Sequence, residues 1–172
     1  MQRVLQQIIT SVFCFLVISI GSVSAKTMTD FSGKPATIEQ YTGKGKWTIV
    51  MFWASDCLIC NKEARHYDEF HLKHKNKDAI VLGVSMDGQA NKKAAEGFIK
   101  EHKLNFPNIL GEPEDVAVFF YDSTGEHWAG TPTFLIYSPK GELKVQQIGA
   151  VPVPLIEEFI QQQTAGQSKA SK

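Results

Sequence analysis

The chain is constrained most by the segment Trp47–Trp53 (WTIVMFW), a nearly continuous run of apolar, aromatic and β-branched residues. A run of this kind is typical of a strand that is covered on both faces. Ala79–Met86 (AIVLGVSM) is a second such run. The segment between the runs has helical periodicity, and its apolar positions lie roughly on one face: Cys60, Ala64, Tyr67, Phe70 and Leu72. Strand, helix and strand in this order indicate a domain in which helices connect parallel strands.

The rest of the chain continues this alternation. Residues 26–46 are rich in turn residues and are expected to form a short extended segment or a hairpin. The further elements expected are an amphipathic helix over Asn91–Leu104 with Ala94, Ala95, Phe98 and Ile99 inward, a short strand within Asn105–Leu110, a short helix over Glu114–Tyr121, a hairpin of Thr133–Tyr137 and Leu143–Ile148, and a closing helix over Pro154–Gln163. This order predicts one α/β domain over residues 26–164, with a mixed sheet flanked by helices, and a flexible tail over residues 165–172.

Residues 1–25 differ in composition from the rest. Arg3 is the only charged residue there, and the apolar run Ile8–Ile20 is followed by the small residues of Val23–Ala25. This pattern predicts a signal peptide that is cleaved before Lys26. The alternative is an uncleaved N-terminal membrane anchor, but the run is shorter than the ~20 residues that a span needs. Cys14 lacks the small residues that precede a lipid-modified cysteine, so no lipid anchor is expected.

The charges are balanced, with 18 Lys and Arg against 18 Asp and Glu, so no nucleic-acid partner is expected. Without residues 1–25, the cysteines that remain are Cys57 and Cys60. A disulfide between them closes a loop so short that it constrains the unfolded chain little. The pair is therefore poorly suited to stapling the fold and well suited to being made and broken.

The motif Cys57-Leu58-Ile59-Cys60 lies where an apolar strand runs into a helix. The spacing puts both sulfurs within one helical turn. Cys57 falls at the helix N-terminus, where unpaired N–H groups and the helix dipole favour a thiolate. Cys60 is more shielded and can resolve a mixed disulfide that Cys57 forms.

The cysteine pair has three alternative roles. A structural disulfide is one, and the short loop disfavours it. Two buried reduced thiols are another, and an oxidising compartment disfavours them. Half of a zinc site is the third, and it needs two further ligands. His66, His71 and His74 could supply them, but on a lysine-rich helix they are interpreted as a solvated face. We therefore expect neither a metal nor another cofactor.

Three segments resemble one known family. Phe52–Cys60 (FWASDCLIC) is similar to the strand–CxxC–helix segment of thioredoxins, and Gly130–Ile136 (GTPTFLI) to the cis-proline segment that faces it. Val81–Asp87 (VLGVSMD) is similar to the central strand of the TlpA-like branch, which works in bacterial envelopes. Over about residues 28–163 the chain thus resembles the TlpA-like branch of the thioredoxin superfamily. The resemblance implies a thioredoxin fold and a periplasmic location.

The resemblance also implies roles for individual residues. Cys57 is the attacking thiol and Cys60 the resolving thiol. Thr131 and Pro132 hold a cis peptide bond beside Cys57, an isomer almost confined to proline, and leave backbone groups free for an extended client; an ordinary trans proline is the alternative. Trp53 packs under the active-site loop and is grouped with Thr131 and Pro132 as substrate-binding, while a plain core aromatic is the alternative.

Two positions depart from the family pattern. Asp56 stands where many relatives have tryptophan. A carboxylate beside Cys57 opposes thiolate formation by about 1 kcal/mol, which lowers the reduction potential by ~20–30 mV and favours a reductant; a carboxylate that points into solvent is the alternative. Met51 replaces the buried aspartate that helps thioredoxins to deprotonate the resolving thiol. Glu63 and Asp87 are the candidate replacements, unless they are simply solvated.

These features favour a protein disulfide reductase, in which Cys57 attacks a client disulfide and Cys60 releases the reduced client. The implied partners are a client protein with disulfides or thiols and a membrane thiol–disulfide electron donor, and the protein is expected to be a monomer. A disulfide-donating oxidase or isomerase is the alternative within the same class, and only the reduction potential decides between them.

Two further functions belong to other classes. A peroxiredoxin-like thiol peroxidase is disfavoured, because the residue three before Cys57 is Ala54, where the peroxide-activating Pro-x-x-x-Thr/Ser-x-x-Cys arrangement requires Thr or Ser. A non-catalytic module that binds clients through the cis-proline groove is the other. The sequence leaves open whether Leu58, Ile59 and Trp128 form an apolar docking patch or merely lie in loops.

Overall fold

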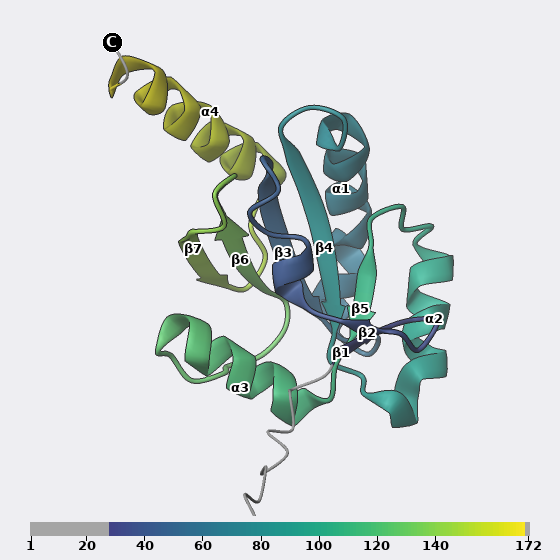
Figure 1. Cartoon of the computed structure of the whole chain (residues 1–172). Helices are drawn as coiled ribbons and strands as arrows, with labels where there is room; N and C mark the ends of the chain where they lie inside the picture. The colour runs from purple at the N-terminus through teal and green to yellow at the C-terminus, as the bar shows by residue number, and fades with distance from the viewer. Residues whose placement is uncertain (1–27, 171–172) are drawn as a thin grey trace, which may run out of the picture.

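The computed structural model describes residues 28–170, with side chains as far as residue 166, as a mixed sheet flanked by helices (Figure 1). The strands are β1 (Met28–Asp30), β2 (Pro35–Ala36), β3 (Trp47–Trp53), β4 (Ala79–Ser85), β5 (Asn108–Leu110), β6 (Thr133–Tyr137) and β7 (Leu143–Ile148). The helices are α1 (Leu58–His74), α2 (Lys92–Glu101), α3 (Pro113–Thr124) and α4 (Val153–Ala170), with 3-10 turns η1 (Ile38–Gln40) and η2 (Gln89–Asn91). The signal peptide expected over residues 1–25 lies outside the described residues. No helix among residues 28–170 is long and apolar enough to cross a membrane.

The central strand β3 is buried on both faces of the sheet. Its odd-numbered residues, from Trp47 to Trp53, belong to a core cluster with side chains of α1, α2 and α4. Val50 and Phe52 belong to a second cluster with side chains of α3 and η1. Successive side chains of a strand point to opposite faces. An unbroken apolar run is therefore what a strand between two helical layers requires.

The strand order brings several segment ends to one edge of the sheet. The strands follow the order β2-β1-β5-β4-β3-β6-β7. The strands β3, β4 and β5 are parallel, so their carboxyl ends share an edge. The strand β6 is antiparallel to β3, and its first residue, Thr133, lies opposite Phe52. The segments that follow β3 and β4 and the segment that precedes β6 therefore meet at this edge.

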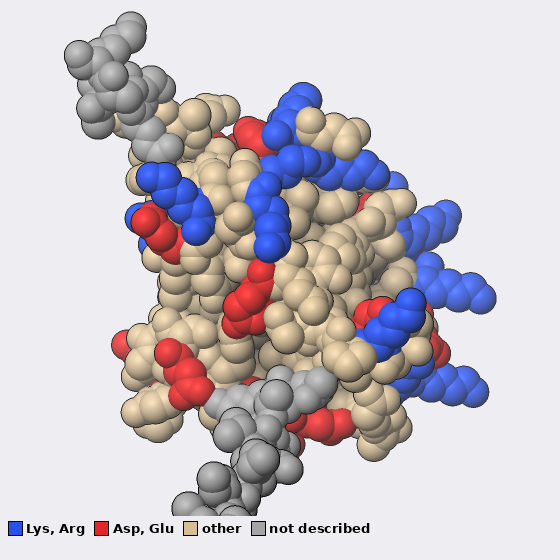
Figure 2. Space-filling view, in the orientation of Figure 1, with Lys and Arg blue, Asp and Glu red and all other residues tan. Residues whose placement is uncertain are grey.

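The surface carries both signs of charge. Figure 2 shows lysine and arginine side chains across the top of the molecule and along the right-hand side that carries α2, with acidic side chains between some of them. Large uncharged areas separate these charges in the same view. The balanced composition is thus also visible as a mixed distribution on this face.

Most of the expected elements are confirmed, including the α/β class, the N-terminal hairpin β1–β2 and the bounds of β3, β6 and β7. Two helix faces differ from the expectation. Leu72 is 44% exposed, because it lies two residues, about 200° of helical turn, from the buried Phe70. Ala94 is exposed for a similar reason, while its neighbour Ala95 is buried. Two helix ends differ as well, since α2 stops at Glu101 and α4 continues beyond residue 163.

The interpretation of His66, His71 and His74 as a solvated face is wrong for two of them. The side chain of His66 is 60% exposed, but that of His74 is only 13% exposed and His71 is buried. Nδ1 of His71 accepts a hydrogen bond of 3.1 Å from the backbone N–H of Val81. This amide lies on β4 before the short β5 begins to pair with it, so the imidazole replaces a missing strand partner. Burial, followed by the charge of Lys75, lowers the pKa of His71.

Replacing His71 by Ala leaves the buried N–H of Val81 without a partner, and we expect the free energy of unfolding to fall by about 2–4 kcal/mol. His71→Gln keeps an acceptor and should lose less. Because the pKa of folded His71 lies below that of the unfolded chain, acidification below about pH 6.5 protonates mainly the unfolded state. Urea unfolding should therefore show the wild type losing stability relative to His71→Gln as the pH falls from about 7.5 to about 5.5. Parallel pH curves for the two proteins would contradict this account.

Candidate active site

Cys57 and Cys60 lie at the start of α1, immediately after the loop that leaves β3. They form a disulfide with a Cα–Cα distance of 5.2 Å. Cys57 is the N-cap residue of α1, and its Sγ accepts a hydrogen bond of 3.1 Å from the backbone N–H of Cys60. Cys57 is partly exposed, whereas Cys60 is fully buried. The fold therefore offers one sulfur of the pair to a partner and shields the other.

The electrostatic surroundings of Cys57 come from the helix and from Asp56. The first turn of α1 contains no acidic residue, so no side chain within that turn opposes the positive end of the helix dipole at Cys57. Asp56 is exposed and makes no hydrogen bond or ion pair within residues 28–170. Its charge adjoins Cys57 in the chain but is screened by solvent.

Asp87 holds the loop between β3 and α1. Its carboxylate accepts hydrogen bonds of 3.1 Å from the backbone N–H of Ser55, and it also accepts from the hydroxyl of Ser55. The hydroxyl of Ser85, the last residue of β4, donates to the same carboxylate at 2.6 Å. A carboxylate engaged in this way fixes the loop. These contacts favour a positioning role for Asp87 over that of a free base for Cys60.

Glu63 lies one turn beyond Cys60 on α1. Its side chain is 28% exposed, and its carboxylate lies 3.3 Å from Nδ1 of His66. Residues three apart on a helix are neighbours, with Cβ atoms about 5–6 Å apart. Glu63 is therefore a neighbour of Cys60 along α1.

The segment Thr131–Pro132 lies beside the start of α1. Its peptide bond is cis. The strand β6 begins at Thr133, opposite Phe52 of β3. Continuing this antiparallel register by two residues places Thr131–Pro132 beside the residues that lead from β3 to Cys57. The topology thus brings together two motifs that are far apart in the sequence.

The backbone groups of this segment differ in whether they have hydrogen-bond partners. The carbonyl of Pro132 accepts a hydrogen bond of 2.8 Å from the N–H of Gly149, and the hydroxyl of Thr133 donates to the carbonyl of Gly130 at 2.6 Å. In the part of the chain that the structure describes, neither the N–H nor the C=O of Thr131 has a hydrogen-bond partner. These two groups are free to pair with an extended polypeptide.

Trp53 packs in the core at the end of β3, next to the loop that leads to Cys57. It is fully buried, and its ring stacks on Phe98 of α2 at a centroid distance of 4.2 Å and an angle of 17°. Its Nε1 donates to Oδ1 of Asn108 at 3.1 Å. A Cβ at Gly83 would overlap the carboxamide of Asn108 and approach Trp53 Nε1 to 2.8 Å. Because Trp53 has no exposed surface, its assignment as a residue that contacts the substrate is corrected to that of a packing residue.

The sequence contains a signal for Gly83, the residue that leaves room for Asn108 and Trp53. Gly83 interrupts the buried run Ala79–Met86, and glycine inside a strand often marks a close approach of other atoms. The polar partner Asn108 carries no comparable signal. Its role depends on the pairing of β4 with β5, in which Gly83 lies opposite Asn108.

The apolar surface near the cysteines is formed by the residues between them. Leu58 is 78% exposed and Ile59 is 48% exposed. Trp128 does not extend this exposed surface, because it is half-buried. The centroid of its ring lies 5.5 Å from that of Phe52 and 5.2 Å from that of Phe120. The apolar docking patch left open by the sequence is therefore reduced to Leu58 and Ile59.

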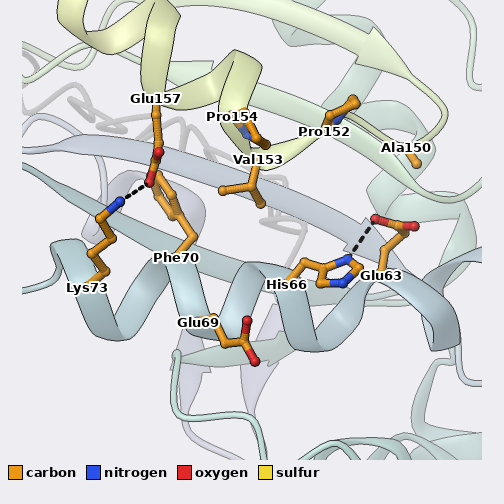
Figure 3. Close-up of a pocket in the computed structure, with 10 residues that line it drawn as sticks. All are labelled: Glu63, His66, Glu69, Phe70, Lys73, Ala150, Pro152, Val153, Pro154 and Glu157. Carbon is orange, nitrogen blue, oxygen red and sulfur yellow. Dashed lines mark hydrogen bonds and ion pairs between the residues drawn. The ribbon is translucent and has the colours of Figure 1, made fainter.

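A groove of about 580 Å³ lies along α1 on the side of α4 (Figure 3). Phe70, Val153 and neighbouring prolines give it an apolar lining. One end carries the pair of Glu63 and His66, and the other the pair of Lys73 and Glu157, which are 2.8 Å apart. An apolar recess with paired charges at its rim suits an apolar side chain better than a phosphate or a metal ion. No group of three or more His, Cys, Asp or Glu side chains among the described residues is arranged to hold a metal.

A redox-active cysteine pair at a helix N-terminus, with a cis-proline beside it in a sheet of this order, defines a thiol–disulfide oxidoreductase with a thioredoxin fold. The protein is thus a redox enzyme. The chain belongs to the AhpC/TSA family, which matches residues 22–146.

Two of the relatives are named thiol-disulfide oxidoreductases, and one is a peroxiredoxin. The sporulation thiol-disulfide oxidoreductase A of Bacillus subtilis is 30% identical over 125 residues, which are 69% of each chain. The thiol-disulfide oxidoreductase ResA of Oceanobacillus iheyensis is 25% identical over 128 residues, which are 73% of this chain and 61% of that protein. The crystal structure of StoA from Bacillus subtilis has a TM-score of 0.60 and 26% identity, covering 77% of this chain and 93% of that one. Peroxiredoxin Q of Sedum lineare is 32% identical, over 52% of this chain and 46% of that protein. The expected thioredoxin fold and redox class are confirmed.

Proposed function

We propose that the protein is a disulfide reductase of the bacterial envelope that transfers two electrons from Cys57 and Cys60 to a client protein. The observation that carries the proposal is the unequal exposure of the pair, since Cys57 is partly exposed at the helix N-terminus and Cys60 is fully buried. An exposed, stabilised thiolate suits attack, and a shielded thiol suits resolution.

The reaction proceeds in two exchanges. The thiolate of Cys57 attacks one sulfur of the client disulfide, and the other client sulfur leaves as a thiolate that takes up a proton. Cys60, once deprotonated, attacks Sγ of Cys57 in the mixed disulfide and releases the second client thiol. The client gains two electrons and two protons, and Cys57 and Cys60 are left as a disulfide. A membrane dithiol donor then has to return the two electrons for another cycle.

The client is bound as an extended segment along Thr131. The free N–H and C=O of this residue allow two backbone hydrogen bonds, as in the addition of a strand to an open edge. The exposed Leu58 supplies apolar contact beside the attacking sulfur. Binding of this kind needs no fixed client sequence, because the hydrogen bonds involve only the client backbone.

The envelope location rests on the first 25 residues. A short apolar run followed by small residues is typical of an exported chain, and we place the mature domain in the periplasm as a monomer with the signal peptide removed.

Thiol peroxidase activity is the second candidate, favoured by the similarity to peroxiredoxin Q. Activation of peroxide by a cysteine requires hydroxyl and cationic groups around the thiolate, and the residue three before Cys57 is Ala54, which has no hydroxyl. We therefore rank this activity below disulfide exchange. Hydrogen peroxide turnover by the reduced protein that outpaces insulin reduction would reverse the ranking.

The proposal predicts different fates for two serine variants. With a disulfide-containing client such as insulin, Cys60→Ser should accumulate a mixed disulfide through Cys57, since the resolving thiol is absent. Cys57→Ser should form no such adduct and should lose at least about 100-fold of the insulin-reducing activity. Non-reducing electrophoresis and mass spectrometry of the adduct measure both effects. Retained reduction by Cys57→Ser would assign the attack to a different group.

Asp56 opposes the thiolate of Cys57, so Asp56→Asn should raise the reduction potential by about 20–30 mV. Equilibration with glutathione or dithiothreitol buffers measures this potential. Glu158→Gln, which removes an exposed carboxylate on α4, is the matched control and should leave it unchanged. A wild-type value near that of thioredoxin, about −270 mV, supports a reductase. A value near that of DsbA, about −120 mV, would make the protein a disulfide donor, and an unchanged potential in Asp56→Asn would refute the role of Asp56.

We propose that the carboxylate of Glu63 accepts the proton of the Cys60 thiol. Glu63 is half-buried and lies one turn from Cys60 along α1. Glu63→Gln should slow resolution of the mixed disulfide by about 10- to 100-fold near pH 7 and leave the attack by Cys57 unchanged. The defect should shrink above about pH 9, where the thiol ionises without a base. Stopped-flow kinetics of client release over a pH series measure it, with Glu69→Gln as the control on the same helix. A defect that does not depend on pH would mean that Glu63 acts only on structure.

A further inference from the structure

Two backbone carbonyls of the active-site loop converge on one side chain. Nδ2 of Asn61 donates to the carbonyl of Ser55 at 3.1 Å and to the carbonyl of Cys57 at 2.9 Å. The backbone N–H of Asn61 also donates to the carbonyl of Cys57, at 3.0 Å, as the first hydrogen bond of α1. Asn61 therefore ties the loop to the first turn of the helix at the residue that carries the exposed sulfur.

The orientation of this amide is set from another helix. Nε2 of His102 lies 2.9 Å from Oδ1 of Asn61. Since Nδ2 of Asn61 faces two carbonyls, the facing oxygen can only accept, so His102 donates its Nε2–H. His102 is the C-cap residue of α2, and its ring packs on Phe98 at a centroid distance of 4.5 Å. Phe98 in turn stacks on Trp53, so the chain of contacts is anchored in the core.

We propose that Asn61 and His102 act as a positioning pair that holds Cys57 in the N-cap geometry in which the N–H of Cys60 points at its sulfur. That N–H lies 3.1 Å from Sγ of Cys57. In the reduced protein the same bond becomes charge-assisted and stabilises the thiolate. Neither residue touches a reacting atom, so the pair acts through the backbone. The inference rests on the proposed role of Cys57 as the attacking thiol.

Loss of the pair has a defined chemical consequence. A looser N-cap weakens the hydrogen bond to the thiolate, which raises the pKa of the reduced Cys57 thiol and destabilises the reduced form relative to the disulfide. The potential then falls and the attack on a small disulfide slows at neutral pH. A role in stability alone would lower the melting temperature without moving the thiol titration or the potential.

The test compares four variants of the protein with the wild type. Asn61→Ala should shift the equilibrium constant with glutathione about tenfold toward the protein disulfide, which is about 30 mV. His102→Ala should shift it about threefold in the same direction. His102→Gln can still donate an N–H to Asn61 and should stay within about twofold of the wild type. Asn76→Ala, at an exposed site two residues beyond the end of α1, is the control and should not shift it.

Two further readouts separate this role from a structural one. The absorbance of the thiolate near 240 nm should show a higher titration midpoint for Cys57 in Asn61→Ala and His102→Ala than in His102→Gln. Melting curves identify any variant that does not fold. If Asn61→Ala does not fold, the comparison of His102→Ala with His102→Gln still distinguishes a positioning role from a structural one. Wild-type potential and titration in both His102 variants would overturn the positioning role. A mixed disulfide trapped through Cys60 in place of Cys57 would instead overturn the proposed function, whatever these variants do.

Discussion

The site depends on the burial of β3 between two helical layers. Its side chains alternate between two core clusters, so a slip of one residue would exchange every side chain between them. The register is therefore fixed, and with it the position at which the chain leaves the sheet toward Cys57. The neighbour β6 is fixed by pairing with the same strand, which places Thr131–Pro132 at the same edge. Both halves of the site thus take their positions from one strand.

Two electrostatic effects act on Cys57 in opposite directions. The helix N-terminus favours a thiolate by about 0.3–1 kcal/mol at exposed sites and by up to ~2 kcal/mol when the group is partly buried. Asp56 opposes it by about 1 kcal/mol, less where solvent screens the charge. Cys57 is partly buried as the N-cap and Asp56 is exposed, so the helix effect is the larger. The net effect favours the thiolate form of Cys57, but by less than it would without the carboxylate of Asp56.

The sequence predicted the strands and the redox pair well, because both depend on local patterns. The nearly unbroken apolar run Trp47–Trp53 and the spacing of Cys57 and Cys60 are visible without knowledge of the fold. The polar supports were not predictable in this way. His102 lies 41 residues from Asn61, and Trp53 lies 55 residues from its partner Asn108. Only the packing of α2 and the pairing of β5 bring these groups together, and single polar residues carry no periodic signal.

The loop before Cys57 is held from two sides by bonds that do not involve sulfur. Asp87 binds Ser55 from the end of β4, and Asn61 binds the carbonyls of Ser55 and Cys57 from α1. None of these bonds includes a sulfur atom, so cleavage of the disulfide does not by itself remove any of them. The N–H of Cys60 already faces Sγ of Cys57, so reduction strengthens an existing contact through the new charge. The backbone is therefore organised for both redox states, and the exchange of electrons with a client requires movement mainly of the two sulfurs.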